Sequence, residues 1–210
     1  MIPNQIQEKG ILAKLLEKAI KILLKKECKK IGKIEINIFA SSVQIIRGII
    51  QNIHIIAKEI NYKELLFDEV ELEANNIKSI FKISNKELNL KNNFIIKFKL
   101  SLSENSLKTI LFSKKWNWIG DMISKEILNE NKFKDIKIKN DQLLIKTLND
   151  SEDINEYEKI NIKTEDGKIY LENTACNKLM MIPIEDKVCI NTVNIKNNLI
   201  NIFANSPISF

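Results

Sequence analysis

Arginine, histidine, glycine and proline are scarce in this chain of 210 residues. It contains one histidine, five glycines and three prolines, and Arg47 is the one arginine among 33 basic residues. Because the glycines are scattered, there is no phosphate-cradling loop or nucleotide-binding fingerprint. A protein that reads bases or clamps phosphates is expected to use the planar, bidentate arginine side chain. The scarcity of arginine therefore argues against nucleic-acid binding, although the sequence pI is about 9.0.

Cysteine and histidine are too few and too dispersed to form a recognisable site. Cys28, Cys176 and Cys189 are odd in number and far apart in the sequence, which implies no disulfide framework and favours a reducing compartment. His54 lies in an apolar run without a second histidine, so we interpret it as an ordinary strand residue rather than a zinc ligand or catalytic group. We expect no metal and no cofactor, and we predict that the protein is not an enzyme.

Long hydrophobic runs are also missing. The longest uncharged run, residues 197–210, contains four asparagines and is shorter than the roughly 20 apolar residues that a membrane-spanning helix needs. The first ten residues lack the basic start and apolar segment of a signal peptide. We therefore expect a cytoplasmic protein, either free or peripheral on a membrane.

Isoleucine, lysine and asparagine dominate what is present, as an AT-rich genome would dictate, so lysine abundance by itself indicates no partner. The position of the charge is more informative. Residues 8–33 hold nine lysines against three glutamates, a net charge of +6. This equals the net charge of the whole chain, so the remainder is neutral.

Apolar residues recur at three- and four-residue steps between Ile11 and Leu24, which predicts an amphipathic helix with Gly32 as its stop. Lysines occupy the opposite stripe. They either face water while the apolar stripe covers a sheet, or also contact anionic headgroups. A third interpretation places the helix itself in the membrane interface. The lysines of this stripe are Lys14, Lys18, Lys21, Lys25 and Lys29.

Alternating residues predict strands over residues 33–40, 49–57, 65–75 and 94–100. In the third of these, Val70, Leu72 and Ala74 alternate with Glu69, Glu71 and Glu73. A side-chain period of two sends the two sets to opposite faces, one apolar and one acidic. Residues 78–90 show no pattern that predicts either a helix or a strand.

The second half of the chain reads as helices followed by hairpins. Ser103 is a candidate N-cap for one or two helices that reach residue 128, with a break at residues 114–115. Turn signals then predict hairpins over residues 136–145, 160–172 and 193–202, with residues 149–158 as an acidic loop. The Trp116 and Trp118 pair, beside two lysines, is typical of a membrane-interface anchor. The interpretation that we favour places Trp118 in the core and leaves only Trp116 at the surface.

The order of these elements predicts an α+β fold with mostly antiparallel pairing. An N-terminal helix precedes a long sheet, one or two helices lie in mid-chain, and a β-meander ends the chain. Without a linker rich in proline, glycine or serine, we predict a single domain over residues 1–210.

The spacing of apolar residues over residues 33–77 goes beyond alternation. A strand and a glycine turn precede a second strand that ends Ala-x-x-aliphatic-x-Tyr and a third of the type Leu-x-Phe-x-x-Val-x-Leu-x-Ala-x-x-Ile. The positions concerned are Gly48, Ala57, Ile60, Tyr62, Leu65, Phe67, Val70, Leu72, Ala74 and Ile77. This spacing resembles the LmeA-like family of bacterial phospholipid-binding proteins, catalogued in cyanobacteria and actinobacteria as a domain of unknown function. Glu64 departs from it, since the family often has glycine there.

The resemblance implies a fold similar to tubular lipid-binding domains, in which a long curved sheet wraps around an amphipathic helix. It also implies a non-enzymatic phospholipid-binding or lipid-transfer protein at an anionic cytoplasmic or thylakoid membrane surface. Its partners would be phospholipid or another acyl lipid, and no nucleic acid. The alternative is a solid-cored structural or adaptor protein that binds a protein partner and no lipid. The candidates for an apolar cleft are Leu12, Leu16, Ile20, Leu23, Val70, Leu72, Phe94 and Phe98; those for the membrane surface are the five lysines above and Trp116.

Overall fold

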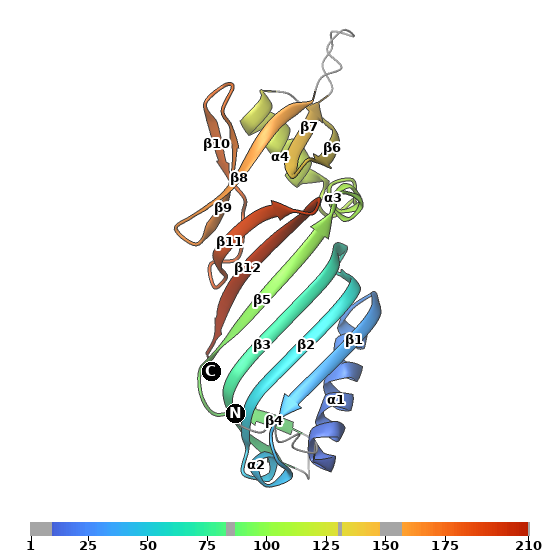
Figure 1. Cartoon of the computed structure of the whole chain (residues 1–210), viewed down its shortest axis with the longest axis vertical. Helices are drawn as coiled ribbons and strands as arrows, with labels where there is room; N and C mark the ends of the chain where they lie inside the picture. The colour runs from blue at the N-terminus through green and yellow to red at the C-terminus, as the bar shows by residue number, and fades with distance from the viewer. Residues whose placement is uncertain (1–9, 83–86, 130–131, 148–156, 210) are drawn as a thin grey trace, which may run out of the picture.

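The computed structural model describes residues 10–82, 87–129, 132–147 and 157–209. These residues form four helices and twelve strands, which confirms the predicted α+β class (Figure 1). The elements in chain order are α1 (Ile11–Glu27), β1 (Lys30–Phe39), α2 (Ser42–Ile46), β2 (Ile49–Tyr62), β3 (Leu65–Lys82), β4 (Glu87–Leu90), β5 (Phe94–Ser103), α3 (Glu104–Leu111), α4 (Asn117–Leu128), β6 (Phe133–Lys139), β7 (Gln142–Thr147), β8 (Glu158–Glu165), β9 (Lys168–Asn173), β10 (Lys178–Met181), β11 (Cys189–Lys196) and β12 (Leu199–Ile208).

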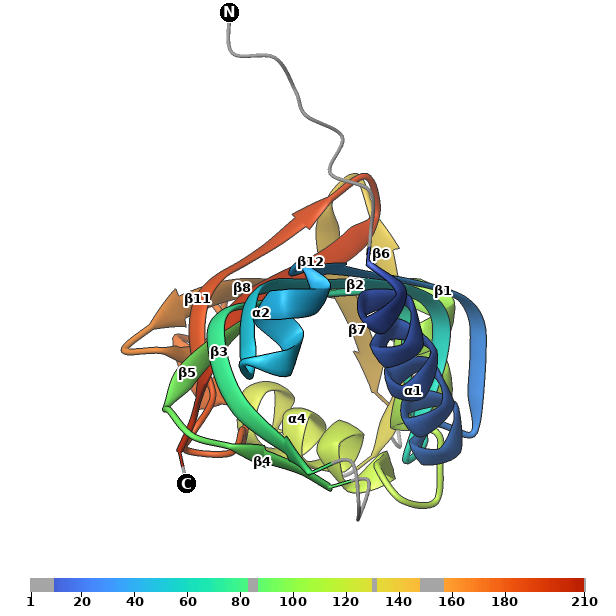
Figure 2. The same ribbon diagram turned by 90° about the horizontal axis from the view of Figure 1, so that it is seen from below.

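The strands form two sheets stacked along the long axis of the molecule. The first has the order β1-β2-β3-β5-β12-β11, with β4 paired to β3, and the second has the order β10-β9-β8-β7-β6. The first sheet is curved, and α1 and α2 lie on its concave side at the lower end (Figure 2). The second sheet lies at the upper end with α3 and α4 (Figure 1).

The C-terminal strands do not form one continuous meander. Strand β12 pairs antiparallel with β5, so the last hairpin completes the first sheet, while β6 to β10 form the second. Pairing between segments so far apart leaves no local signal in either strand, which is why the sequence did not indicate it.

The two faces of the first sheet have the composition that the alternation predicts. Along one row the cross-strand partners are Ile36, Ile55, Leu72, Phe98 and Ala204, so apolar side chains line the concave face. The neighbouring row on the convex face contains Asn37, His54, Glu73 and Lys97. The acidic face predicted for β3 is thus the outer face of the sheet.

Two residues with left-handed backbone interrupt the alternation. Asn76 has a φ of 54°. Ala74 before it and Ile77 after it are both buried, although residues three positions apart in a regular strand point to opposite faces. Glu59 has a φ of 52° and lies against Gly32, where a Cβ would come within 3.0 Å of the Glu59 carboxylate. The prediction that Gly32 ends the first helix is wrong, because α1 ends at Glu27 and Gly32 lies within β1, next to Glu59 of β2.

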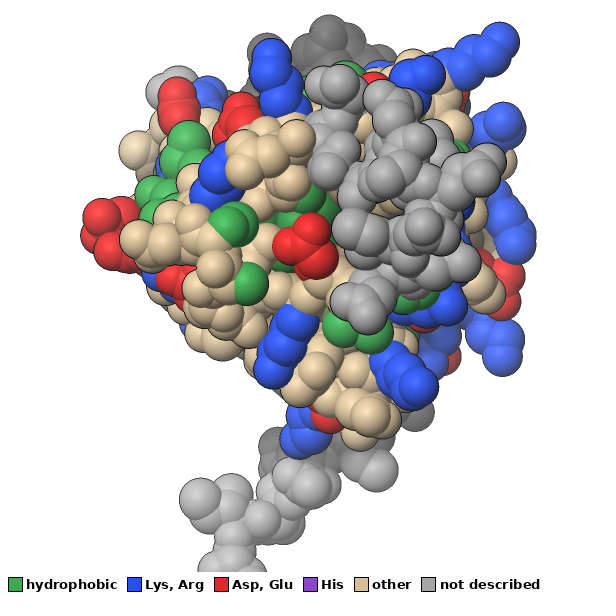
Figure 3. Space-filling model, turned by 90° about the horizontal axis from the view of Figure 1, so that it is seen from above, with side chains coloured by type: hydrophobic (Ala, Val, Ile, Leu, Met, Phe, Trp, Pro, Cys, Tyr) green, Lys and Arg blue, Asp and Glu red, His purple; other side chains and the backbone are tan. Residues whose placement is uncertain are grey.

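The upper helices confirm the predicted cap and break. The Ser103 hydroxyl accepts a hydrogen bond from the Ser106 N–H (3.3 Å), and α3 and α4 are separated by residues 112–116. The buried stripe of α4 contains Gly120, Ile123 and Ile127. Trp118 lies off this stripe and is 45% exposed, so the prediction that it belongs to the core is wrong. The predicted acidic loop, residues 149–158, lies largely outside the described residues. The upper surface of the molecule carries both acidic and basic side chains (Figure 3).

Candidate functional site: an apolar cavity between helix and sheet

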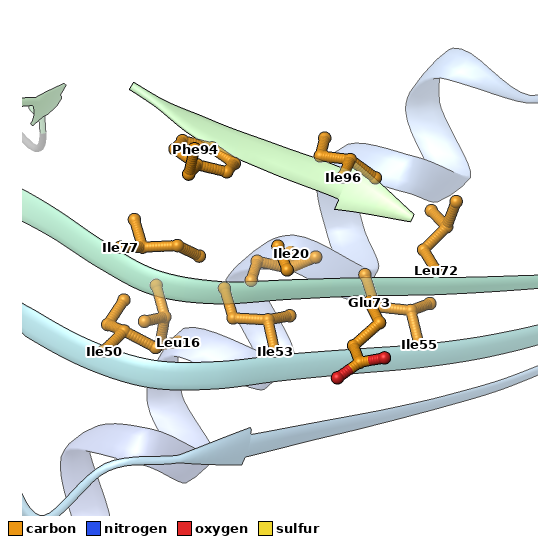
Figure 4. Close-up of a pocket in the computed structure, with 11 residues that line it drawn as sticks. Leu16, Ile20, Ile50, Ile53, Ile55, Leu72, Glu73, Ile77, Phe94 and Ile96 are labelled. Carbon is orange, nitrogen blue, oxygen red and sulfur yellow. The ribbon is translucent and has the colours of Figure 1, made fainter. Parts of the chain in front are cut away.

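A cavity of about 220 Å³ lies between α1 and the concave face of β2, β3 and β5. Figure 4 shows side chains from the helix and from the three strands gathered around a common space. Ten of its eleven lining residues are apolar, so its interior suits a hydrocarbon rather than a polar ligand. The lining residues are Leu16, Ile20, Ile50, Ile53, Ile55, Leu72, Glu73, Ala74, Ile77, Phe94 and Ile96.

Glu73 is the exception, and its carboxylate is bonded to side chains of the convex face. One of its oxygens accepts hydrogen bonds from Asn52 Nδ2 (3.2 Å) and Asn75 Nδ2 (2.9 Å). Since a carboxylate without partners would be costly next to an apolar space, these two amides compensate the charge outside the cavity.

The space exists because the helix and sheet are joined by few large buried side chains. Among the described residues, the core here consists of Ala13, Ile38, Ile50, Ala74 and Ile77. Two of the five are alanines, whose small side chains fill little volume between the layers.

The apolar arc of α1 is wider than the stripe that faces the sheet. At about 100° per residue, Leu23 and Leu15 lie roughly 20° and 100° around the helix from Leu16. Both are exposed, as are Ile11 and Ile22, and Leu23 is 61% exposed. The hydrophobic surface of the helix therefore continues from the cavity out to solvent.

Four of the eight predicted cleft residues line the cavity, namely Leu16, Ile20, Leu72 and Phe94. The other four, Leu12, Leu23, Val70 and Phe98, are not among its lining residues. Phe98 instead packs against the core of the upper half.

The β2 residues that line the cavity were not among the predicted cleft residues. Ile53 and Ile55 flank His54 and pair with Ala74 and Leu72, so the alternation of β3, carried across to its partner strand, could have identified them. Ile50 and Ile77, by contrast, carry no such signal, because they share the concave face only through the kink at Asn76.

The five predicted surface lysines, which we call the lysine stripe, are all exposed. Those on the helix lie roughly 140–200° around α1 from Leu16, on the side away from the cavity. The basic surface and the apolar cavity thus occupy opposite sides of one helix. The members are Lys14, Lys18, Lys21 and Lys25 on α1, and Lys29 after it.

Trp116 has a structural partner. Its indole N–H donates a hydrogen bond to the carbonyl of Lys63 (3.0 Å), and the Lys115 Nζ lies 5.2 Å from the centroid of its ring. The side chain thereby joins the turn between α3 and α4 to the hairpin between β2 and β3.

His54 and the acidic row of β3 take part in cross-strand pairs on the convex face. The His54 Nε2 lies 2.8 Å from Glu71 Oε1, and the Lys58 Nζ lies 3.1 Å from Glu69 Oε2. Partly exposed pairs of this kind contribute little, typically about 0–1 kcal/mol. Within the described ranges, no group of three or more histidine, cysteine, aspartate or glutamate residues is placed to hold a metal ion.

Comparisons with protein-family models, curated proteins and solved structures find no match for this chain. None of the helices in the described ranges combines the length and the apolar character needed to cross a membrane. The apolar cavity and the surfaces around it are therefore the features from which a function can be inferred.

Proposed function

We propose that this protein binds phospholipid or another acyl lipid without chemically altering it, and that it acts at an anionic membrane surface. The observation that carries the proposal is the cavity lined by apolar side chains between α1 and the curved sheet. Burial of a hydrocarbon chain there is favourable by about 0.8 kcal/mol for each CH₂ removed from water.

The size of the cavity defines how much of a lipid it holds. An apolar cavity of about 150 Å³ accommodates benzene. A cavity of about 220 Å³ has room for one end of an acyl chain, not for a whole lipid. The rest of the chain would lie along the exposed apolar residues of α1, such as Leu15 and Leu23, or remain in the membrane.

Electrostatics supports an anionic surface as the place of action. The lysine stripe is exposed, and residues 8–33 contain the whole net charge of the chain. A lysine close to an anionic bilayer contributes roughly 1 kcal/mol to binding. The membrane location, cytoplasmic or thylakoid, is part of the same proposal.

The competing function is that of an adaptor without a lipid ligand. In that case the edge strand β1 of the first sheet would pair with a strand of a protein partner. The cavity between α1 and the sheet favours the lipid, because an adaptor of this kind has no need of an apolar space.

Native mass spectrometry of delipidated protein mixed with phosphatidylglycerol tests the proposal. We expect one lipid per chain, and we expect the Ala74→Phe variant, which places an aromatic ring in the cavity, to bind none. Ala175→Phe is the matched control, because Ala175 is exposed in a turn of the upper half and the same bulk there leaves the cavity open. A wild-type chain that takes up no phospholipid would refute lipid binding and favour the adaptor.

A further inference from the structure

Large hydrophobic side chains gather, exposed, at the lower end of the molecule. Val43 and Ile46 on α2 are 57% and 74% exposed, and Phe39 and Ile49 flank them at the ends of β1 and β2. The start of α1 lies beside them, since a Cβ on Gly10 would come within 2.4 Å of the Ser42 hydroxyl. Figure 2 shows α2 and the start of α1 at this end. We call the five exposed residues Ile11, Phe39, Val43, Ile46 and Ile49 the apolar tip.

The apolar tip is held in a defined shape. The Gln44 N–H donates to the Ser41 hydroxyl (3.2 Å), and the Ser41 N–H donates to Gln44 Oε1 (2.8 Å), which is a capping box. Ile45 packs against the lower core while its neighbour Ile46 stays exposed. The exposure of Val43 and Ile46 is thus a property of the fold and not of a frayed end.

Basic residues flank the tip, and the Glu17 carboxylate of α1 also lies near it, where it accepts a hydrogen bond from the Ile38 N–H (2.9 Å). Residues 36–58 contain no aspartate or glutamate, whereas Arg47 follows α2 directly and is exposed. Lys14, also exposed, lies in the first turn of α1. The opposite end of the molecule shows acidic and basic side chains interspersed (Figure 3). Apolar side chains flanked by basic ones complement an anionic bilayer.

The tip lies close to the cavity along β2. Ile49 is exposed in the tip, and the next residue, Ile50, lines the cavity on the opposite face of the strand. Since the cavity holds only one end of an acyl chain, the remainder of a bound lipid needs another apolar environment nearby. A bilayer in contact with the tip provides it.

We infer that the protein docks end-on to an anionic bilayer, with Val43 and Ile46 among the acyl chains and with Arg47 and Lys14 at the headgroups. This inference rests on the proposed lipid-binding function and adds to it the surface of approach. It differs from docking through the lysine stripe. Lys14 and Lys25 are roughly 16 Å apart along α1, about twice the Debye length in physiological salt, so only the lysines near the tip contribute.

Flotation with vesicles of phosphatidylglycerol and phosphatidylcholine tests the docking surface. The double variant Val43→Asp/Ile46→Asp is expected to lower the partition coefficient by at least about tenfold. The matched control is Leu179→Asp/Met181→Asp on β10, where the two side chains are 50% and 47% exposed. The control should bind like the wild type. Equal losses in both variants, or none in the tip variant, would overturn the inference.

Charge reversals separate the two orientations. Lys14→Glu/Arg47→Glu is expected to weaken vesicle binding by roughly fivefold or more per charge, and Lys21→Glu/Lys25→Glu by much less. Equal effects of the two pairs would show side-on docking and contradict the end-on orientation. If the tip instead joined two copies of the chain, the wild type would sediment as a dimer and Val43→Asp/Ile46→Asp as a monomer, which would also contradict it.

Uptake of a monomeric lysophospholipid, measured by native mass spectrometry, distinguishes this inference from the proposed function. The tip variant should lose flotation and keep lysophospholipid binding, because its cavity is unchanged. The Ala74→Phe variant should show the opposite pattern. Flotation of a wild type that takes up no lysophospholipid would refute lipid binding in the cavity, yet leave the docking surface supported.

Discussion

The upper and lower halves of the molecule are built from the same kinds of residue but are packed differently. Among the described residues, the upper core joins α3, α4, the second sheet and the strands β11 and β12 through 17 buried hydrophobic residues. The lower core has five, and Ala13 is the one fully buried residue of α1. The stability of the chain therefore resides mainly in the upper half, which allows the lower half to keep a cavity.

The difference follows from what surrounds each helix. Helices α3 and α4 contribute to a core that both sheets complete, so α4 buries Ile123 and Ile127 almost entirely. Helix α1 has the first sheet on one side and solvent on the other. A helix in that position cannot bury a wide apolar arc unless another molecule covers the remainder.

The difference between the two halves is tested most strongly by truncating one large aliphatic side chain in each half. Ile145→Ala, in the upper core at 0% exposure, is expected to lower the free energy of unfolding by about 4 kcal/mol. Leu16→Ala, which enlarges an existing cavity at a partly exposed position, should cost about 1 kcal/mol. Urea unfolding followed by tryptophan fluorescence measures both. Equal losses would contradict the assignment of stability to the upper half.

A second substitution tests whether the turn before β2, in the lower half, is rigid. Gly48 has a φ of 73°, and a Cβ there would lie 1.6 Å from the Ser79 carbonyl oxygen. Gly48→Ala should lower the free energy of unfolding by about 3 kcal/mol. Gly32→Ala is the milder comparison, because the three atoms nearest its Cβ, at 3.0–3.1 Å, belong to the Glu59 side chain and not to the backbone. If the two variants were equally stable, the turn before β2 would not be rigid.

Acid should act on an ionic cluster in the upper half. Lys108 Nζ lies 2.9 Å from Glu104 Oε1 and 3.0 Å from Asp135 Oδ1, and the Tyr157 hydroxyl donates to Asp135 (2.6 Å). Burial by itself raises the pKa of Glu104, but the Ile138 N–H and Lys108 outweigh it, so the net pKa lies below its usual value. The pKa of Asp135 is lowered in the same way, against burial, by Tyr157 and Lys108.

Because these carboxyl pKa values are lower in the folded state than in the unfolded chain, their contribution is present above about pH 4 and is lost as the pH falls through the folded values. Lys108→Met should cost about 1 kcal/mol at pH 7 and little at pH 2. Lys168→Met, which removes a pair with the fully exposed Asp186, should cost less at both pH values. Urea titrations at the two pH values measure this, and a Lys108→Met loss independent of pH would contradict the cluster.

The smallest expected effect lies at the hairpin near the boundary of the halves. Lys63 and Glu64 form a two-residue turn with φ values of 51° and 70°, whereas the other such turns among the described residues use asparagine, aspartate or glycine. Glu64→Gly should raise the free energy of unfolding by about 0.5–1 kcal/mol, because glycine adopts this conformation without a Cβ clash. Asn198→Gly at the equivalent turn should change it little. A destabilised Glu64→Gly would show that side-chain contacts of Glu64 matter more than its backbone.

Local sequence patterns predicted the fold class, because apolar residues repeat with one period in strands and another in helices. Alternation at Val70, Leu72 and Ala74 defines the concave face, and the three- and four-residue steps define α1. The cavity could not be predicted from the spacing of apolar residues alone. Its two residues next to the kink, Ile50 and Ile77, depend on the left-handed conformation of Asn76, which asparagine tolerates but does not require.

Long-range packing explains the remaining errors. The pairing of β12 with β5 depends on the closure of the whole sheet. The exposure of Trp118 depends on which side of α4 meets another layer. An apolar side chain has the same sequence signature whether it fills a core, lines a cavity or faces a membrane, so the upper and lower halves could not be told apart before the structure.

The most direct test of lipid binding between α1 and the sheet uses a phospholipid with a photoreactive group at the end of one acyl chain. After irradiation, peptide mass spectrometry should locate the cross-links on α1 around Leu16 and Ile20 and on β2 and β3 between Ile50 and Ile77. They should disappear in Ala74→Phe. Cross-links confined to the convex face or to the upper half, or unchanged in that variant, would contradict the account.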